Sequence, residues 1–296
     1  MRAPTVDVML PFYGDPELLQ RAVRSVQQQH RTDWRLTVVD DGYPDESVGR
    51  WFDALGDDRV RYRRNPERLG AQPNNRYCID LVELPYFVMM GADDLLLPDY
   101  LDTVIRLHER WPAAAVVQPG VEVMDSDEQP VRPLADRVKA MIAPGGTGPR
   151  LVSGENLAVR LLWGNWLYNP SLCWRTDAVR VVGVPESADV FDLALPVDVV
   201  VAGGSIVVDD HVCFRYRRHR SSDSGSGAAA GNRFAEERRY FRAEARRMDA
   251  RGWHRAARAA RGHLSSRLNA AVQLPGALAR RDSAALRALG GHLLTW

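Results

Sequence analysis

The 296-residue chain has few cysteines and no long apolar run, and each absence excludes a class of protein. Its three cysteines, Cys78, Cys173 and Cys213, are far apart, so they form neither a metal-binding spacing nor a plausible disulfide framework. This usage favours a reducing compartment. The N-terminal apolar run is too short for a signal peptide, and no window approaches the roughly 20 residues that span a bilayer. We therefore expect a cytoplasmic protein, with peripheral membrane association as the alternative.

A charge excess of one sign is also missing from the chain as a whole. The net charge is +1 and the hydrophobic fraction is 45%, so the composition is that of an ordinary folded protein. The segment from Arg233 to Trp296 differs, because it contains 14 arginines and 5 acids. The simplest interpretation is a solvated amphipathic cover. Contact with a membrane surface through these C-terminal helices is the second interpretation, and we do not expect nucleic acid as a partner.

Glycine-rich phosphate loops are absent as well. Neither GxGxxG nor GxxxxGK[ST] occurs, which disfavours dinucleotide and P-loop chemistry. A nucleotide-binding protein of this kind must neutralise a diphosphate in another way, and a metal ion would do so.

The first 120 residues alternate between strand-like and helix-like segments. We expect strands at 5–10, 34–40, 59–64, 85–90 and 113–119, and helices at 16–30, 47–55, 71–84 and 98–111. This alternation predicts an α/β fold with a mostly parallel central sheet flanked by helices.

The remaining chain is less regular. Residues 119–152 are rich in proline and glycine, so we expect a mobile or functional loop there. A helix is expected at 153–168, capped by Ser153, and strands at 171–176 and 205–219. The predicted division is a domain over 1–222, with halves at 5–120 and 121–222, then a flexible link at 223–232 and an Arg-rich helical extension over 233–296.

Two acidic pairs follow strands of this predicted sheet. Asp40–Asp41 and Asp93–Asp94 each lie at a carboxyl end, which is the edge where such sheets bind ligands. Asp93–Asp94 can be a solvated turn before a helix, because Pro98 follows shortly. The alternative is a site for Mg²⁺ or Mn²⁺, which bind one or two carboxylates together with substrate phosphates.

The ordered segments "VDVMLPFYGDPELLQ", "WRLTVVDDG", "RVRYRRNPERLGAQPNNR" and "PYFVMMGADD" resemble family 2 glycosyltransferases of the GT-A fold. The resemblance is strong over 5–120 and weaker over 150–222. It implies nucleotide-binding roles for Pro11, Phe12 and Tyr13 at the base, Asp41 at the base and Asp93 at the ribose. It also implies that Asp94 coordinates Mn²⁺ or Mg²⁺.

An inverting glycosyltransferase needs a carboxylate as general base. In the resembled family this acid opens a helix that a glycine closes about three turns later. The segment "FDLALPVDVVVAGG" fits with Asp192 as the base and Gly203 at the end, and Asp189 and Asp198 are the competing acids. Asp192 can also be a plain helix cap. Pro196 suits a first helical turn, so the helix can begin later than Asp192.

Two further groups complete the predicted site. "FRYRRHRSSDS" resembles the closing strand of the family, with His219 as a third metal ligand or a diphosphate contact. Its arginines can stabilise a leaving diphosphate or form a solvated turn. Trp163, Asn165 and Trp166 are candidates for acceptor binding, and a core cluster is the alternative for the tryptophans.

These observations predict a metal-dependent, inverting glycosyltransferase. The donor would be a nucleotide-diphospho-sugar of the UDP, dTDP or GDP type. The acceptor hydroxyl would belong to a saccharide, a lipid-linked saccharide or a small natural product. A nucleotidyltransferase, or a non-catalytic nucleotide-sugar-binding protein, is the alternative.

Overall fold

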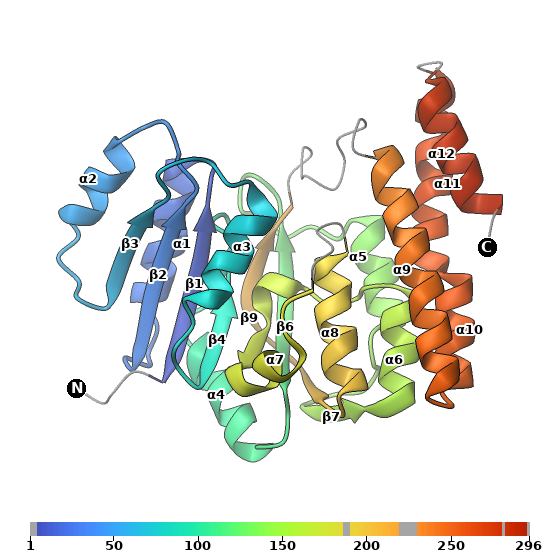
Figure 1. The fold of residues 1–296 in the computed structure, drawn as a ribbon. Helices are drawn as coiled ribbons and strands as arrows, with labels where there is room; N and C mark the ends of the chain where they lie inside the picture. The colour runs from blue at the N-terminus through green and yellow to red at the C-terminus, as the bar shows by residue number, and fades with distance from the viewer. Residues whose placement is uncertain (1–4, 186–189, 219–229, 280–281, 295–296) are drawn as a thin grey trace.

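The computed structural model describes residues 5–185, 190–218, 230–279 and 282–294. A nine-stranded sheet runs through the molecule, and helices cover both of its faces (Figure 1). The strand order is β3 (Val60–Arg64), β2 (Trp34–Asp40), β1 (Val6–Phe12), β4 (Tyr86–Met89), β8 (Cys173–Arg175), β6 (Val116–Met124), β9 (Ser205–Arg217) and β5 (Leu95–Leu96), and β7 (Arg150–Ser153) pairs with β9. The predicted α/β class with a central sheet between helices is therefore confirmed.

The N-terminal half of the sheet is parallel. Its four strands are β1 (Val6–Phe12), β2 (Trp34–Asp40), β3 (Val60–Arg64) and β4 (Tyr86–Met89). β1 lies between β2 and β4 and pairs in parallel with both. Because the three strands run the same way, the residues that follow Phe12, Asp40 and Met89 meet at one edge of the sheet.

The C-terminal half is mixed. Its strands are β5 (Leu95–Leu96), β6 (Val116–Met124), β7 (Arg150–Ser153), β8 (Cys173–Arg175) and β9 (Ser205–Arg217). β8 joins the two halves through antiparallel pairs with β4 and β6, whereas β6 and β9 are parallel. β5 and β7 pair antiparallel with β9. The long strand β9 therefore carries its carboxyl end back toward the edge where β4 ends.

Helices connect the strands of the N-terminal half. They are α1 (Pro16–Gln27), α2 (Ser47–Asp53), α3 (Ala71–Asp80) and α4 (Tyr100–Arg110). Asp15 caps α1 by accepting a hydrogen bond from the amide of Glu17 at 2.8 Å, and Pro16 stands in the first turn.

Residues 119–152, expected to be irregular, contain regular structure. β6 extends to Met124, α5 spans Leu134–Ile142 and β7 begins at Arg150. The expectation of a loop was wrong because α5 turns little apolar surface inward, with Ile142 partly buried against the core. Its one buried residue is Asp136, while Leu134 and Met141 are 69% and 83% exposed.

The core lies on both faces of the sheet, and successive residues of β1 point to opposite sides. Val8 and Leu10 pack with residues of α1 and α4, whereas Met9 packs on the other side with residues of α6 and α8. The helices of this half are α6 (Gly154–Trp163), α7 (Thr176–Val182) and α8 (Phe191–Val201), with a 3-10 turn at Asn169–Ser171.

Four helices follow β9. They are α9 (Ala230–Ala250), α10 (His254–Gly262), α11 (Leu264–Ala279) and α12 (Ser283–Leu294). α9 and α10 lie beside α6, whereas α11 and α12 extend beyond the main body (Figure 1). α9 begins inside the range 223–232 that was expected to be a link, and residues 223–229 lie outside the described part of the chain. None of the described helices combines the length and apolarity needed to cross a bilayer.

Candidate active site

The acidic pair after β4 lies in a turn between β4 and β5. The side chain of Asp94 is 1% exposed, and its Oδ1 accepts a hydrogen bond from the amide of Arg217 at 2.8 Å. Asp93 and Asp94 direct carboxylate oxygens toward Gly91. Asp94 Oδ2 and Asp93 Oδ1 lie 2.6 and 2.9 Å from the position that a Cβ on residue 91 would take. Glycine at this position therefore leaves the space in which the two carboxylates converge.

Burial raises the pKa of Asp94 well above its ordinary value, and the charge of the neighbouring Asp93 raises this pKa further. Arg217 opposes the two effects. Its guanidinium is buried and donates from Nε to the carbonyl of Asp93 at 2.8 Å and from Nη2 to Glu128 at 2.8 Å. A buried carboxylate beside a second carboxylate is stabilised by positive charge, so this pair is suited to hold a cation.

The second acidic pair organises the loop after β3. Asp41 is 2% exposed, and its carboxylate accepts hydrogen bonds from Asn65 Nδ2 at 3.0 Å and from the amides of Leu69 and Gly70, each at 2.8 Å. The neighbouring Asp40 is fully buried and accepts hydrogen bonds from Tyr62 and from the amide of Tyr43. Asp41 was predicted to contact the base. In the structure its carboxylate already holds the loop of residues 65–70 through these hydrogen bonds.

The residues that end β1 divide between core and surface. Pro11 is half-buried and lines a cavity described below, whereas Phe12 is 1% exposed and packs against Tyr43. Tyr13 is 44% exposed, and the guanidinium of Arg68 lies 3.8 Å from its ring centroid. Tyr13 is therefore the one aromatic ring of the predicted trio Pro11–Tyr13 that a base can reach.

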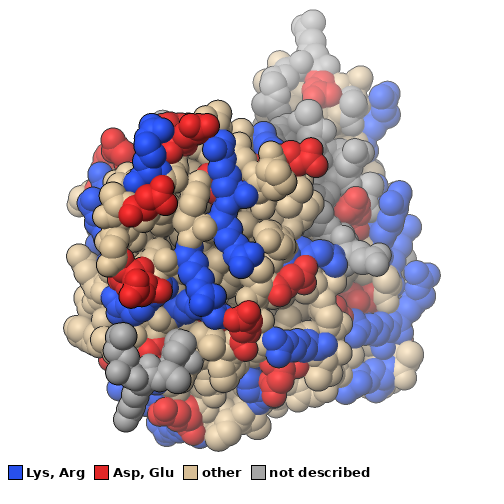
Figure 2. Space-filling model, turned by 60° about the vertical axis from the view of Figure 1, so that its left-hand side comes forward, with Lys and Arg blue, Asp and Glu red and all other residues tan. Residues whose placement is uncertain are grey.

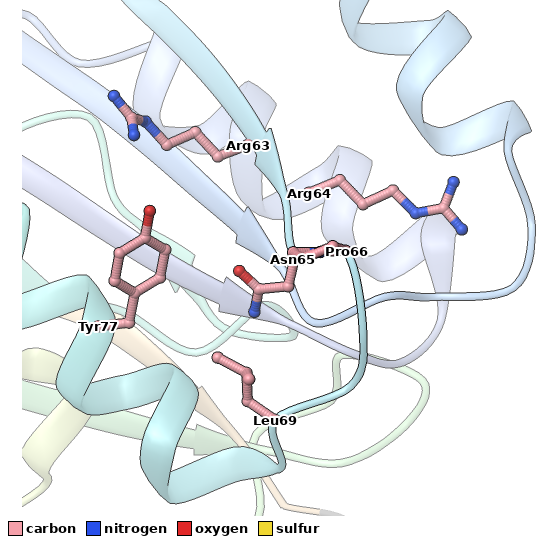
Figure 3. Close-up of a pocket in the computed structure, with 6 residues that line it drawn as sticks. All are labelled: Arg63, Arg64, Asn65, Pro66, Leu69 and Tyr77. Carbon is pink, nitrogen blue, oxygen red and sulfur yellow. The ribbon is translucent and has the colours of Figure 1, made fainter.

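A small cavity of about 420 Å³ lies beside this region, between the end of β3 and α3 (Figure 3). It is lined by Arg63, Arg64, Asn65, Pro66, Leu69 and Tyr77. Asn65 and Leu69 also hold Asp41, so this cavity adjoins the predicted nucleotide site. On the face around α2 and β3, Arg side chains are interspersed with those of Asp and Glu (Figure 2).

A larger cavity of about 530 Å³ joins the two predicted halves of the site. Gly91 and Pro11 line it on the side of the nucleotide residues, and Asp192 lines it on the other side. Between them lie Tyr168, Tyr216 and Arg218, and the rings of the two tyrosines are 5.5 Å apart. The cavity thus extends from Gly91, next to the acidic pair, to the predicted general base.

The predicted base stands in the first turn of α8, with an exposed side chain. α8 begins at Phe191 and is followed by Gly203, whose φ of +97° suits glycine. The expectation that Pro196 marks a later start was wrong, because Pro196 lies inside the helix. Pro196 has no amide hydrogen to donate to the carbonyl of Asp192. The side chains of Asn165 and Asn169 donate to that carbonyl instead, each at 3.0 Å.

The three predicted acceptor residues, Trp163, Asn165 and Trp166, have different surroundings. Asn165 lines the cavity and holds the backbone of Asp192. Trp166 is 1% exposed and belongs to the core, so its ring faces protein. Trp163 ends α6 and is 48% exposed. The aromatic residues that line the cavity are Phe87, Tyr168, Trp174, Phe191 and Tyr216.

One polar cluster in the cavity was not predicted. It centres on Lys139 of α5, the sole lysine of a chain with 38 arginines. Its Nζ donates to the carbonyl of Leu167 at 2.8 Å and lies 4.4 Å from the ring centroid of Tyr168. Burial lowers the pKa of Lys139 to about 8, although the nearby carboxylates of Asp136 and Asp192 oppose this shift. The use of a single lysine among many arginines was the available sequence signal.

Asp136 fixes α5 to this cluster. Its Oδ1 accepts hydrogen bonds from the hydroxyl of Tyr168 at 2.9 Å and from Arg218 Nη2 at 2.6 Å. Spacing could not reveal this residue, because a single inward acid on a short helix makes no periodic pattern.

The side chains available at the acidic pair determine whether a divalent cation can bind there. Among the described residues, no group of three or more His, Cys, Asp or Glu side chains is arranged to hold a metal. The predicted ligand His219 lies outside the described residues. Mg²⁺ and Mn²⁺ commonly use one or two carboxylates plus phosphates of the substrate. Asp93 and Asp94, which converge over Gly91, fit this mode.

Comparisons with known proteins agree with this arrangement. The family model for glycosyl transferase family 2 matches residues 7–166. The uncharacterized protein MT1568 of Mycobacterium tuberculosis is 31% identical over 108 residues, which are 36% of this chain and 33% of that protein. The GalNAc(5)-diNAcBac-PP-undecaprenol beta-1,3-glucosyltransferase of Campylobacter jejuni is 27% identical over 105 residues, which are 35% of this chain and 34% of that protein.

Among solved structures, S. aureus TarS 1–349 in complex with UDP-GlcNAc is similar with a TM-score of 0.61 and 12% identity. The match covers 80% of this chain and 65% of that chain, and it supports the GT-A fold. The part of this chain that matches the Mycobacterium tuberculosis and Campylobacter jejuni proteins spans about a third of the length of each of them.

Proposed function

Because the chain belongs to glycosyl transferase family 2, we propose that it transfers a sugar from a nucleotide-diphospho-sugar donor to a hydroxyl group of an acceptor. The observation that carries the proposal is the cavity of about 530 Å³ that links Gly91, beneath the acidic pair, to Asp192. A donor whose diphosphate lies near Asp94 would place its sugar in this cavity. The acceptor hydroxyl would then enter beside Asp192.

The nucleotide would bind at the carboxyl ends of β1, β2 and β4. Tyr13 offers an exposed ring for the base, and Asp41 holds the loop that borders this position. Asp93 would bind the ribose and Asp94 the cation. The TarS structure contains UDP-GlcNAc, so UDP-sugars are the first donors to test, before dTDP- and GDP-sugars.

The chemistry follows from the position of Asp192. Its carboxylate would accept the proton of the acceptor hydroxyl while that oxygen attacks the anomeric carbon. The bond from this carbon to the diphosphate oxygen breaks on the opposite face, so the configuration inverts. A bound Mg²⁺ or Mn²⁺ would supply positive charge for the diphosphate that leaves. Arg218 lies in the same cavity and adds a second cation.

The acceptor would be a saccharide, a lipid-linked saccharide or a small natural product. The name of the Campylobacter jejuni relative specifies an undecaprenol-linked saccharide, which supports the second class. Tyr168, Trp174 and Phe191 would offer aromatic faces to a sugar ring.

Two variants separate donor binding from chemistry. We expect Asp94→Ala to weaken Mn²⁺-dependent binding of UDP and to abolish turnover, because the buried carboxylate is removed. Asp192→Asn should abolish turnover and leave UDP binding unchanged. Calorimetry with UDP, with and without Mn²⁺, and release of nucleoside diphosphate from a panel of nucleotide-sugars measure the two quantities. Asp177→Asn changes a carboxylate on α7 outside the cavity and serves as the matched control.

The products decide between the alternatives. A nucleotidyltransferase would release pyrophosphate from a nucleoside triphosphate rather than nucleoside diphosphate from a nucleotide-sugar. A non-catalytic binding protein would bind UDP in the presence of Mn²⁺ and show no turnover in any variant. Undiminished transfer by Asp192→Asn would remove this residue as the base.

A further inference from the structure

Helix α11 packs on the protein through both polar and small apolar residues. The hydroxyl of Ser266 bonds to Glu237 of α9 and to Nε2 of His292 of α12, the latter at 2.7 Å, and all three side chains are buried. Arg267 of the same helix donates to Nε2 of His263 at 3.2 Å. The side of α11 that packs on the protein therefore combines this polar cluster with the buried residues Ala270 and Ala277.

The outward side of α11 is apolar. Every side chain of this helix that is described as exposed belongs to Leu, Val, Ala or Pro: Leu264, Leu268, Ala271, Val272, Pro275, Leu278 and Ala279. Leu264, Leu268, Val272 and Leu278 are 57%, 50%, 73% and 57% exposed. At 3.6 residues per turn, these positions fall within one third of the helix circumference. We call this surface the α11 stripe.

Such a surface is unusual for a helix in water. An ordinary surface helix turns its polar side chains outward, whereas the side chains of α11 that are described as exposed are all apolar. None of the described residues covers the stripe, because its side chains are exposed. A contiguous exposed apolar surface generally marks contact with a partner or a membrane.

The charge of the surrounding segment identifies the kind of partner. From Arg251 to Trp296 the sequence contains eight arginines and one acid, Asp282. Arg258 and Arg287, on the neighbouring helices α10 and α12, are exposed. A second copy of this chain docked through the same stripe would bring two arginine-rich surfaces together, and like charges oppose that contact. An anionic bilayer surface satisfies both the apolar stripe and the arginines.

We propose that the α11 stripe lies in the interface of a membrane with anionic lipids, with the surrounding arginines at the level of the lipid headgroups. The helix would lie parallel to the bilayer with one side in the acyl boundary, since no described helix is suited to cross it. This inference is independent of the proposed function, because neither α11 nor α12 supplies a residue to the cavity.

Sedimentation of the full chain with lipid vesicles tests the proposal. We expect binding to vesicles of phosphatidylcholine with phosphatidylglycerol, little binding to phosphatidylcholine alone, and weaker binding at high salt. Leu268→Gln with Val272→Gln should lower the partition coefficient by about tenfold or more, because two apolar side chains no longer leave water. Both positions are exposed in the free protein, so the melting temperature should be unchanged.

Val181→Gln is the matched control, because Val181 of α7 is 78% exposed and lies outside the C-terminal helices. Arg258→Gln with Arg287→Gln should weaken binding to anionic vesicles only. Absence of wild-type binding to anionic vesicles would overturn the proposal, as would an equal loss in Val181→Gln. A lipid-free dimer that Leu268→Gln with Val272→Gln dissociates, with vesicle binding unaffected, would assign the stripe to a second copy. Melting curves report folding here, so these outcomes hold whether or not the chain transfers sugars.

Discussion

Among single residues, Gly91 determines how closely the two carboxylates can approach each other. A Cβ at this position would lie 2.6 Å from Asp94 Oδ2 and 2.9 Å from Asp93 Oδ1, and both distances are shorter than a van der Waals contact. Gly91→Ala must therefore displace both acids. We expect Mn²⁺-dependent binding of UDP to fall by roughly tenfold or more, with a loss of about 1–3 kcal/mol in stability from overpacking.

Calorimetry and thermal melting separate these two effects of Gly91→Ala. Gly14→Ala is the control. Gly14 lies in the loop after β1, and a Cβ on this residue would have no atom within 4 Å. If Gly91→Ala bound UDP with undiminished dependence on Mn²⁺, the carboxylates over Gly91 would not be the cation site.

Lys139 offers a test of the cavity that does not depend on turnover. Burial lowers its pKa to about 8, compared with 10.5 for an ordinary lysine. An amine-reactive ester should therefore acylate Nζ with a midpoint near pH 8, and UDP-sugar in the cavity should slow this reaction. Peptide mass spectrometry distinguishes Lys139 from the N-terminal amine, and Lys139→Arg is the control. A midpoint near 10.5 would place the amine in open solvent.

The same pKa difference has a consequence for stability. Between pH 8 and 10.5 the unfolded chain binds the proton of Lys139 more tightly than the folded chain does. The contribution of Lys139 to the free energy of unfolding therefore increases as the pH rises from about 8 to 10.5. Melting curves of the wild type and Lys139→Met isolate the effect, because other titrating groups are common to both proteins. The wild type should gain stability relative to the variant as the pH increases from 8 to 10.5.

At the scale of elements, α8 is held by two asparagines in place of a backbone hydrogen bond. Pro196 cannot donate to the carbonyl of Asp192, and Asn165 and Asn169 do so from the preceding loop. Asn165→Ala with Asn169→Ala should cost about 1 kcal/mol or slightly more, because the carbonyl loses its protein partners. In a Pro196→Ala background the backbone amide of residue 196 becomes the donor. The cost of the asparagine substitutions should then be smaller.

A thermodynamic cycle of these variants measures the coupling by chemical denaturation. Additive effects would show that the asparagines stabilise the loop alone and not the start of α8. Turnover should fall in the double asparagine variant and recover in part with Pro196→Ala, because the backbone of Asp192 is the group that these contacts hold.

The contrast between β2 and α5 shows which elements the sequence could predict. β2 was expected at the residues where it occurs, because Thr37, Val38 and Val39 are β-branched and a turn sequence follows Asp40. α5 was missed because its one buried residue is an acid and its large apolar residues Leu134 and Met141 face outward. The paired acids of the site were predictable from their position after strands. Lys139 and Arg217 were not, since their roles depend on contacts with residues far away in sequence.

At the scale of the whole molecule, the C-terminal helices differ in how they join the sheet. Phe241 and Met248 of α9 and Ala257 and Ala260 of α10 belong to the same buried core as the residues of α6 and α8. Glu155, at the start of α6, accepts a hydrogen bond from the amide of Arg255 at 2.7 Å. α11 and α12 instead pack together around a small core of their own. The proposed boundary at residue 222 therefore separates segments that share one core.

Two truncations test this difference between the helices. Removal of residues 223–296 exposes the core surface of α6 and α8, and each large apolar side chain left in water costs about 1.5–3 kcal/mol. Several such losses equal the whole stability of a typical domain, so we expect the chain 1–222 to aggregate or to lack a cooperative unfolding transition. Removal of residues 264–296 leaves α9 and α10 in place and should lower the melting temperature only slightly. Denaturation followed by circular dichroism measures both, and a chain 1–222 that unfolds cooperatively at the wild-type midpoint would show that the first 222 residues form an independent domain.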